Sequence, residues 1–584
     1  MPTDTRTNSS AENSIVGMIA AHPCDAMALA AHSFRLTYGQ LNERSAALAH
    51  GLQLLGVGPG VPIGVFANRK PAGVVGALAV LKAGGCLAPL DPANPPERLA
   101  FMLRDVGAPF VLAERGIADR LPKGAWKTIP LDDAPLPFSK PPSAPPTPAP
   151  NHLACISYIS GPMGRPLGVE ITHAGLLNLI RWHLRAFQVT AADNASQLAP
   201  AGSDTALWET WPYLVAGASL HFPDERTRRS PALLHEWLVE EYITMAYVPP
   251  AMARDLIARG WPYTAAMRYL LTNVEGPVAY SRAKLPFPVV NHYGPTEATV
   301  VATSGPLTVQ GGTGRAIDNA RVMILNEKLE PVRDGAVGEV CIGGAGLARG
   351  YVNQPELTAS KFVPDLFSGN PQARLYRTGD LARRLPDGQI VLAGRRDDQI
   401  QLGGYRMQPA EIERALDLYP EVRRSAVVVR EDTPGERRLV AYVEPAGNAT
   451  PSNKELEEWV RERVPGYMAP SAIVILETLP VTSEGQVDRE ALPAPQQEVE
   501  ASVREEVEAR LAQVIAPLLE VEHIAKDDNL FMVSGQPLLG ALVLDRIQQV
   551  FGVALPANQL FESPTVAALA AQIERAEMPF RSLN

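Results

Sequence analysis

The sequence predicts a multi-domain α/β protein that ends in a separate helical module. From Leu36 to about Glu114, amphipathic helical segments alternate with short apolar runs, which is typical of βαβ units. A region rich in glycine and β-branched residues extends from about Val301 to about Gly394 and predicts strands and hairpins. Beyond residue 502, apolar residues recur at helical spacing. These three patterns define the expected fold class.

The elements follow in order along the chain. The helical segment YGQLNERSAALAHGLQLLGV and the apolar runs VPIGVFA and APFVLAE predict a largely parallel sheet. Residues 134–150 are dense in proline and predict an extended surface linker. A second α/β region runs from Asn151 to about Val301, and a smaller α+β unit opens at Gly394 and closes near Pro495.

The C-terminal module is expected to be a small bundle of three or more helices, because three separate segments each place apolar residues on one face. The predicted faces are Val507, Leu511, Val514 and Leu518; Leu539, Val543, Ile547 and Val550; and Val566, Leu569 and Ile573.

Composition limits the classes of function. With 584 residues, 46% of them hydrophobic, the chain can bury several cores in about four domains or subdomains. A net charge of −10 argues against nucleic acid or an anionic membrane as a partner. No apolar stretch approaches the length of a membrane span, and the N-terminal segment is too weak for a secretion signal. The four cysteines are far apart, which argues against a zinc site or disulfide framework and favours a cytoplasmic protein: Cys24, Cys86, Cys155 and Cys341.

Four motifs in fixed order resemble the core motifs of adenylate-forming enzymes. They are NHYGPTE (291–297), GEVCIGGAGLARGY (338–351), YRTGDL (376–381) and GRRDDQIQLGGYRMQPAEIE (394–413). The segment LKAGGCLAPLDPANPPERLAFML, from Leu81, adds the pattern of amino-acid-specific members. The segment DNLFMVSGQPLLGALVLDRIQQVFG, which ends at Gly552, resembles a peptidyl carrier domain. Over nearly the whole chain, the resemblance is closest to nonribosomal peptide synthetase adenylation and carrier domains.

This resemblance implies an ANL-type fold with four parts. We expect a large adenylation domain over residues 14–393, with doubly wound sheets and a β-rich subdomain, and a small α+β domain over 394–495. A linker at 496–502 and a carrier-like helical bundle at 503–577 would follow.

Such enzymes join a carboxylate to the α-phosphate of ATP, release pyrophosphate, and pass the acyl group to pantetheine. Charge gathers on phosphate oxygens, so catalysis depends on magnesium, positioning and cationic or N–H donors. The resemblance places adenine against Tyr293 and Gly294, phosphate at Thr296, magnesium at Glu297, and the ribose hydroxyls at Asp380. It also assigns ribose and phosphate support to Arg395 and the hinge between the two half-reactions to Asp397. The alternative is that these residues persist only as turn and packing residues.

The segment SDTALWETWPYLVAGASLHF resembles the family's amino-acid-binding segment and implies that Asp204 pairs with the substrate ammonium. Direct contact with substrate and ordinary core packing remain open for Trp208 and Tyr247. The amino acid is not identified. The other pocket positions implied by the resemblance are Thr205, Leu271, Asn273, His292, Val300 and Val301.

The sequence departs from the family pattern where charge must be stabilised. The phosphate loop reads YISGPMGRPLGV, so Ile159, Pro162 and Met163 replace hydroxyl residues and Leu167 replaces a lysine, with Arg165 as one substitute for the charge. A second lysine position, between carboxylate and phosphate, carries Gln486. Pro537 stands where the pantetheine serine belongs and offers neither hydroxyl nor N–H.

Two functions are therefore compared. The first is a catalytically impaired adenylation–carrier didomain that acts as a scaffold or partner in secondary-metabolite biosynthesis. The second is a working amino-acid adenylating ligase that loads a carrier in trans. ATP and magnesium are the expected cofactors if nucleotide binding is retained, and phosphopantetheine is expected to be absent. Expected partners are other synthetase modules or carrier proteins, a small accessory protein and an amino-acid ligand.

Overall fold

The computed structural model describes most of the chain, in two compact units at residues 1–408 and 409–584. The described residues of the first unit are 14–32, 34–131, 148–161, 164–274, 285–397, 399–402 and 405–408. Those of the second unit are 409–433, 436–447, 449–482, 487–489, 491–495, 498–519, 521, 524, 530, 540–551, 553, 555 and 565–581. Most of the predicted proline-rich linker lies outside these ranges. Among the described helices, none has the length and hydropathy that crossing a lipid bilayer requires.

The first sheet of unit 1 is a six-stranded sheet within the described part of the chain, with strand order β6-β5-β3-β4-β7-β8. Only β8 runs antiparallel to its neighbour, which confirms the parallel sheet that the sequence predicts. Its strands are β3 (Pro62–Phe66), β4 (Cys86–Leu90), β5 (Phe110–Ala113), β6 (Lys127–Pro130), β7 (Leu153–Ser160) and β8 (Pro166–Thr172).

Helices connect these strands as local signals dictate. Thr37 and Gln40 form a capping box at the start of α3 (Tyr38–Leu54). A proline begins α4 (Pro71–Ala83), and Gly84 ends it in the left-handed conformation at φ 85°. The remaining connections are α5 (Pro96–Val106) and the 3-10 helix η1 (Arg115–Arg120).

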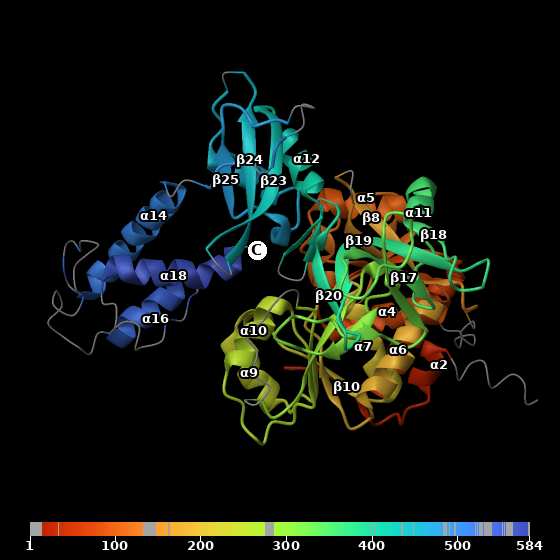
Figure 1. Ribbon diagram of the computed structural model, residues 1–584. Coiled ribbons are helices and arrows are strands. Elements are labelled where there is room, and N and C mark those ends of the chain that lie inside the picture. Colours follow the sequence, from red (N-terminus) through yellow and green to blue (C-terminus); the bar gives the residue numbers. More distant parts are fainter. Residues whose placement is uncertain are drawn as a thin grey trace, which may run out of the picture. The chain divides into compact units, whose positions relative to one another are not determined.

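The second sheet of unit 1 has nine described strands in the order β15-β14-β13-β12-β11-β9-β10-β1-β2. Its strands are β1 (Met27–Ala31), β2 (Phe34–Thr37), β9 (Asn194–Ser196), β10 (Ser219–Phe222), β11 (Met245–Tyr247), β12 (Tyr269–Thr272), β13 (Val289–Tyr293), β14 (Thr303–Pro306) and β15 (Arg315–Ala316). The associated helices are α2 (Ile15–Ala20), α6 (His173–Phe187), α7 (Thr205–Ala216), α8 (Glu225–Arg229), α9 (Pro231–Glu240), α10 (Pro250–Ala258) and η3 (Thr296–Ala298). Figure 1 shows α6 and α7 beside β10.

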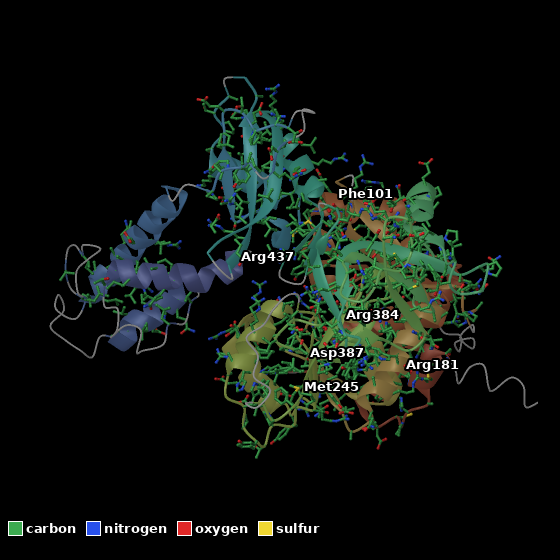
Figure 2. All side chains as sticks on the ribbon, viewed as in Figure 1. Phe101, Arg181, Met245, Arg384, Asp387 and Arg437 are labelled. Carbon is green, nitrogen blue, oxygen red and sulfur yellow. The ribbon has the colours of Figure 1, made fainter. Side chains whose placement is uncertain are left out.

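A smaller antiparallel sheet completes unit 1 and contains the predicted β-rich region. It consists of β16 (Ala320–Leu325), β17 (Gly338–Gly344), β18 (Phe362–Pro364), β19 (Arg374–Arg384) and β20 (Ile390–Arg395). The hairpin between β19 and β20 carries Arg384 and Asp387, both labelled in Figure 2. Helix α11 (Pro355–Lys361) precedes β18, and a two-stranded hairpin of β21 (Ile400–Leu402) and β22 (Tyr405–Met407) closes the unit.

Unit 2 begins with three strands, β23 (Val422–Thr433), β24 (Glu436–Pro445) and β25 (Ala472–Ile475), and with α12 (Pro409–Asp417), α13 (Asn453–Arg461) and η4 (Gly466–Met468). Helix α12 packs on β23 (Figure 1). This is the predicted α+β arrangement. The module after it contains α14 (Glu498–Ile515), η5 (Ala516–Leu519), α16 (Gly540–Phe551) and α18 (Val566–Arg581), as a helical carrier requires.

The three predicted helix faces of this module are largely the buried ones. The third segment buries Val566, Leu569 and Ile573 as predicted. The second buries Val543 and Ile547, whereas Val550 is only partly buried. In α14 the buried residues are Val507, Leu511 and Ile515, and the core continues to Leu519 in η5. The prediction of Val514 and Leu518 on that face was one residue early, since both are only partly buried. Leu539 lies outside the described residues.

Candidate functional site

The assigned nucleotide residues meet where three strands of unit 1 end or bend. Tyr293 closes β13, and its hydroxyl donates to Asp380 Oδ2 at 2.5 Å. Asp380 on β19 is the register partner of Arg395 on β20, and the guanidinium of Arg395 donates to Asp380 Oδ1. The carboxylate is therefore held by one phenol and one guanidinium, in a buried position with 6% of its surface exposed. Three residues assigned from separate motifs form one cluster.

Arg395 also links this cluster to the assigned hinge. Its Nε donates to Asp397 Oδ1 at 2.7 Å, and one terminal nitrogen donates to the carbonyl of Thr378 at 3.0 Å. Burial alone would raise the pKa of Asp397, but the hydrogen bond and charge of Arg395 lower it below its usual value. Gly379 adopts φ 78°, and a Cβ there would lie 2.7 Å from Asp397 Oδ2. The glycine of YRTGDL is thus required by both conformation and space.

Glu297, the assigned magnesium ligand, lies in a buried polar cage. Its Oε1 accepts hydrogen bonds from the hydroxyls of Tyr376 at 2.6 Å and Tyr351 at 2.7 Å. Its Oε2 lies 3.5 Å from a terminal nitrogen of Arg406 and has no hydrogen-bond partner. Sequence reasoning did not assign these three partners. Their only signal was their presence within GEVCIGGAGLARGY, YRTGDL and GRRDDQIQLGGYRMQPAEIE.

The donor set at Glu297 fits a magnesium ion in one respect. Mg²⁺ usually takes one or two carboxylates together with substrate phosphates and water, and the buried Oε2, which accepts no hydrogen bond, would supply one such oxygen. No group of three or more His, Cys, Asp or Glu residues that could hold a metal occurs in the described part of the chain. Glu297 would therefore hold the ion only jointly with a nucleotide, to which magnesium supplies charge neutralisation at phosphate oxygens. Arg406 stands beside the same oxygen.

The backbone that follows Glu297 is strained. Thr299 and Val300 have φ values of 55° and 71°, which β-branched residues rarely adopt. The Thr299 hydroxyl donates to the carbonyl of Gly346 at 2.6 Å and fixes this turn. Gly294 faces it without a side chain, since a Cβ there would lie 2.5 Å from the carbonyl oxygen of Val300. This strain begins two residues after Glu297, and strained backbone of this kind clusters at functional sites.

Asp204 and Thr296 are brought together although 92 residues separate them. The Thr296 hydroxyl donates to Asp204 Oδ2 at 2.6 Å, and Asp204 lies at the N-cap of α7. Burial raises the pKa of Asp204, and the hydrogen bond from Thr296 opposes that rise. This partly buried carboxyl, next to the assigned phosphate contact, can receive the ammonium of an amino acid whose carboxylate faces a nucleotide.

Several of the other residues assigned to the substrate pocket are aromatic rings that pack against one another. Trp208 contacts His292 and Tyr247, with ring centroids 4.8 and 5.5 Å apart, and its Nε1 donates to His183 Nδ1 at 3.0 Å. Tyr247 donates to Asn273 Oδ1 at 2.8 Å. Burial lowers the pKa of His183 to about 3 and that of His292 to about 4, so both rings are neutral at pH 7.

These contacts, together with exposed fractions of only 3% for Trp208 and 7% for Tyr247, support the core-packing interpretation of both residues. His183 was not predicted, because it lies on α6, far from the motif. The other assigned positions lie on neighbouring elements of unit 1. Thr205 is the first residue of α7, Leu271 is on β12, and Val300 and Val301 follow η3.

The phosphate loop lies between β7 and β8. Ile159 and Leu167 are register partners across this hairpin, and both pack against the main hydrophobic core. The Arg165 guanidinium lies 5.9 Å from the centroid of the Phe101 ring. The loop's described part therefore presents an aliphatic pair where the family pattern has a hydroxyl residue and a lysine.

Several assigned positions lie outside the described residues. These are Pro162 and Met163 of the phosphate loop, Gln486 and Pro537. Their roles rest on the sequence alone.

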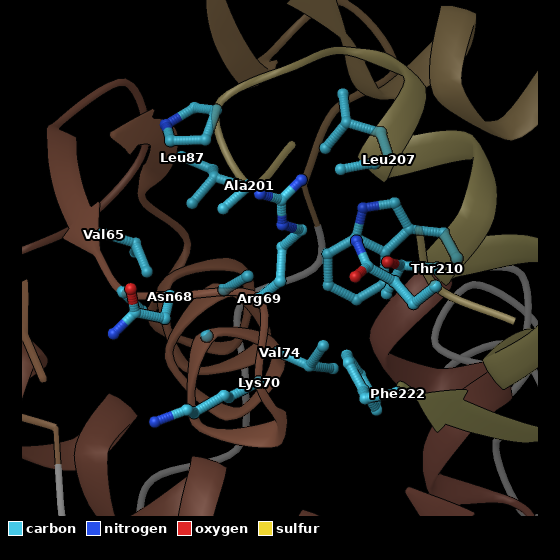
Figure 3. Close-up of a pocket in the computed structure, with 17 residues that line it drawn as sticks. Val65, Asn68, Arg69, Lys70, Val74, Leu87, Ala201, Leu207, Thr210 and Phe222 are labelled. Atoms are coloured by element: carbon cyan, nitrogen blue, oxygen red, sulfur yellow. The ribbon is translucent and has the colours of Figure 1, made fainter. Parts of the chain in front are cut away.

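A partly open cavity lies beside α7. Figure 3 shows Arg69 between Val65 and Leu87 on one side and Leu207 and Thr210 on the other. Its walls come from the carboxyl ends of β3 and β10 and from the start of α4. None of its α7 residues is among those assigned to the amino-acid pocket, and the sequence did not predict this cavity.

The two α/β sheets, the β-rich sheet, the small α+β domain and the helical module together define an ANL-type adenylation fold followed by a carrier domain. Comparison with solved structures agrees. An artificially fused adenylation–PCP didomain from Klebsiella oxytoca superposes with a TM-score of 0.70 at 22% identity, covering 96% of this chain and 98% of that one. At this identity the likeness shows the fold.

The family described as "AMP-binding enzyme" matches residues 18–352, its C-terminal domain matches 411–486, and a "Phosphopantetheine attachment site" matches 509–573. The chain therefore belongs to the AMP-binding enzymes and has the adenylation and carrier domains of a nonribosomal peptide synthetase.

Among curated relatives, a linear gramicidin synthase of Brevibacillus parabrevis is 44% identical over 95% of this chain. The phosphinothricin tripeptide synthetase PhsC of Streptomyces viridochromogenes is 37% identical over 95%. The chain spans 11% of the first relative and 52% of the second.

Proposed function

We propose that this chain is an adenylation–carrier module of nonribosomal peptide synthesis that has lost most of its catalytic capacity and serves as a scaffold or partner for other modules. Its class follows from the three family matches, and the relatives it resembles are much longer peptide synthases and synthetases. Other synthetase modules, carrier proteins and a small accessory protein are the proposed partners, in the cytoplasm.

The main support for the proposed loss of adenylation activity is the aliphatic pair that flanks the phosphate loop. Ile159 and Leu167 face each other across β7 and β8 and pack on the core. Because both side chains are aliphatic, neither side chain offers a hydrogen-bond donor to phosphate. Removing one preorganised donor from a transition state typically costs roughly a hundred- to a thousandfold in rate. Gln486, at a second lysine position of the sequence motif, supplies a dipole instead of a charge.

The second part of the proposal concerns the carrier domain. Phosphopantetheine transfer needs a hydroxyl nucleophile, and Pro537 at the motif position has none. Residues 509–573 match the attachment-site family as a whole, and the proposal concerns this single position within it. We therefore expect a carrier-type fold that is not loaded.

Pyrophosphate exchange tests the catalytic part. The wild-type protein should exchange pyrophosphate very slowly or not at all with each common amino acid, and Gln486→Lys combined with Leu167→Lys should raise the rate. Leu418→Lys, a lysine introduced at an exposed leucine just after α12 and away from both motifs, is the matched control. Wild-type exchange at about 1 per second or faster, a rate ordinary for enzymes, would overturn the proposal.

Intact-mass analysis tests the carrier part. After incubation with coenzyme A and a broad-specificity phosphopantetheinyl transferase, the wild-type mass should be unchanged, and Pro537→Ser should gain one phosphopantetheine. A gain in the wild type, at Ser534 or elsewhere in the module, would contradict it.

The competing function is an active ligase that loads a carrier in trans. Its support is the intact cluster of Tyr293, Asp380 and Arg395 together with the bonded pair of Asp204 and Thr296. Rapid exchange without self-loading would favour this ligase.

A further inference from the structure

The 198–203 segment, which follows β9, leads the chain into Asp204 at the start of α7. It ends in a tight turn, because the N–H and the hydroxyl of Ser203 both donate to the carbonyl of Pro200, at 3.0 and 2.9 Å. Within the turn, Gly202 lies close to Asp91, since a Cβ there would come within 3.0 Å of the Asp91 Cβ. The place of the Asp204 carboxylate therefore depends on how this segment is held.

Glu209 holds the start of the segment from within α7. Its Oε2 accepts hydrogen bonds from the backbone N–H groups of Leu198 at 3.0 Å and Ala199 at 2.6 Å, and its Oε1 lies 3.1 Å from the same nitrogen of Leu198. Glu209 is 2% exposed, and it lies five positions after Asp204 in the sequence. A buried N–H group needs an acceptor, so these bonds tie the segment back onto the helix that Asp204 begins.

The partly open cavity beside α7 borders the same segment. Gln197 and Ala201 line it together with Leu207 and Thr210 of α7, and Figure 3 labels the last three. An atom that faces a cavity lacks packing partners on that side. The hydrogen bonds to Glu209 therefore carry restraint that side-chain packing does not supply on the cavity side.

We propose that Glu209 is a positioning residue for recognition of the amino-acid ammonium, and that it holds the 198–203 segment so that the Asp204 carboxylate stays where the ammonium binds. Thr296 restrains this carboxylate directly, with its hydroxyl 2.6 Å from Oδ2. Glu209 restrains the backbone that carries it and acts through Asp204. The inference rests on the amino-acid site of the proposed function, where Asp204 is assigned to the ammonium.

The test measures how much the ammonium contributes to binding. Each common L-amino acid is titrated into the wild type by calorimetry, and the tightest binder is compared with its deamino analogue, the same carboxylic acid without the ammonium. The ratio of the two dissociation constants, analogue over amino acid, reports the contact with Asp204. Glu209→Met keeps the length and removes both acceptor oxygens. It should lower this ratio at least tenfold, because a displaced charge partner loses most of its effect.

Further variants separate positioning from general stability. Glu209→Asp keeps the charge but is one methylene shorter, so it should also lower the ratio. Glu209→Gln keeps a carbonyl acceptor at the same length and should stay within threefold of the wild-type ratio. Thr210→Val, at the next position of α7, is the matched control and should keep the ratio. A general loss of stability would weaken the binding of ATP, the amino acid and its analogue alike, and would leave the ratio unchanged.

A double-mutant cycle tests whether Glu209 acts through Asp204. Asp204→Asn should bring the ratio close to one, and adding Glu209→Met should leave it there. A wild-type ratio in both Glu209→Met and Glu209→Asp, or a further change when Glu209→Met is added to Asp204→Asn, would overturn the inference and leave the amino-acid site intact. If the wild type binds no amino acid, or its own ratio is close to one, the assigned amino-acid site and the inference both fail.

Discussion

Glu209 should make the stability of unit 1 decrease as the pH rises. Its side chain is 2% exposed, and it accepts hydrogen bonds from the backbone N–H groups of Leu198 at 3.0 Å and Ala199 at 2.6 Å. Burial raises the pKa of Glu209 to about 8, although these donors and the charges of Arg69 and Arg228 oppose the rise. Glu209 lies on α7, the helix that positions Asp204 and Trp208.

The sign and size of the effect follow from proton linkage. The folded protein binds the Glu209 proton more tightly than the unfolded chain, whose pKa is 4.5. The stabilising contribution is therefore complete below pH 4.5 and is lost as the pH rises through 8. At about 1.4 kcal/mol per pH unit, the full interval corresponds to about 5 kcal/mol.

Glu209→Gln is the perturbation, because an amide does not titrate. Urea unfolding is followed by tryptophan fluorescence from about pH 5 to pH 8.5, with Trp208 and Trp211 flanking the substituted position. The wild type should lose about 4 kcal/mol relative to the variant over this range. Glu356→Gln, at an exposed position of α11, should follow the wild type at every pH.

Parallel pH profiles for the wild type and Glu209→Gln would refute the reasoning. They would mean that the backbone donors of Leu198 and Ala199 keep this carboxylate ionised in spite of its burial.

Three further predictions concern the site. Asp380→Ala should weaken ATP binding in calorimetry at least tenfold, because two charge-assisted hydrogen bonds to the ribose are worth about 1.5–3 kcal/mol each. Leu167→Ala should change the affinity less than threefold. If Asp380→Ala binds ATP as tightly as the wild type, the nucleotide site does not include Asp380. Gly379→Ala should lower the free energy of unfolding by about 1–3 kcal/mol, owing to its positive φ and the contact with Asp397, and an unchanged denaturation midpoint would contradict this. Trp208→Phe removes the donor to His183 and should cost about 1–3 kcal/mol of stability, and a smaller loss would show that the bond contributes little.

Much of the fold could be predicted from the sequence because local signals agree with it. The alternation of helical and apolar segments predicts the parallel sheet, and the resemblance predicts the order of the domains. The helix face in α14 could not be chosen by periodicity, since Val514 and Ile515 are both apolar and adjacent. Packing against the other helices selects Ile515.

The site was predictable only where a motif assigns a residue. Tyr293, Asp380 and Arg395 come from separate motifs and do form one cluster. The cage around Glu297 was not predictable, because its partners lie 54 to 109 positions further along the chain and converge only through the antiparallel sheet and the β21–β22 hairpin. The contact of Ile159 with Leu167 likewise depends on strand register.

The register of β7 and β8 also links positions 159 and 167 to each other. A lysine at position 167 would stand opposite isoleucine, with its aliphatic stem against the apolar core and its ammonium directed to solvent, because position 167 is only partly buried. A threonine at 159 alone would leave leucine facing a hydroxyl. The two positions are therefore coupled through strand register: the side chain at 159 sets what the side chain at 167 meets, so a change at one position alters the effect of a change at the other.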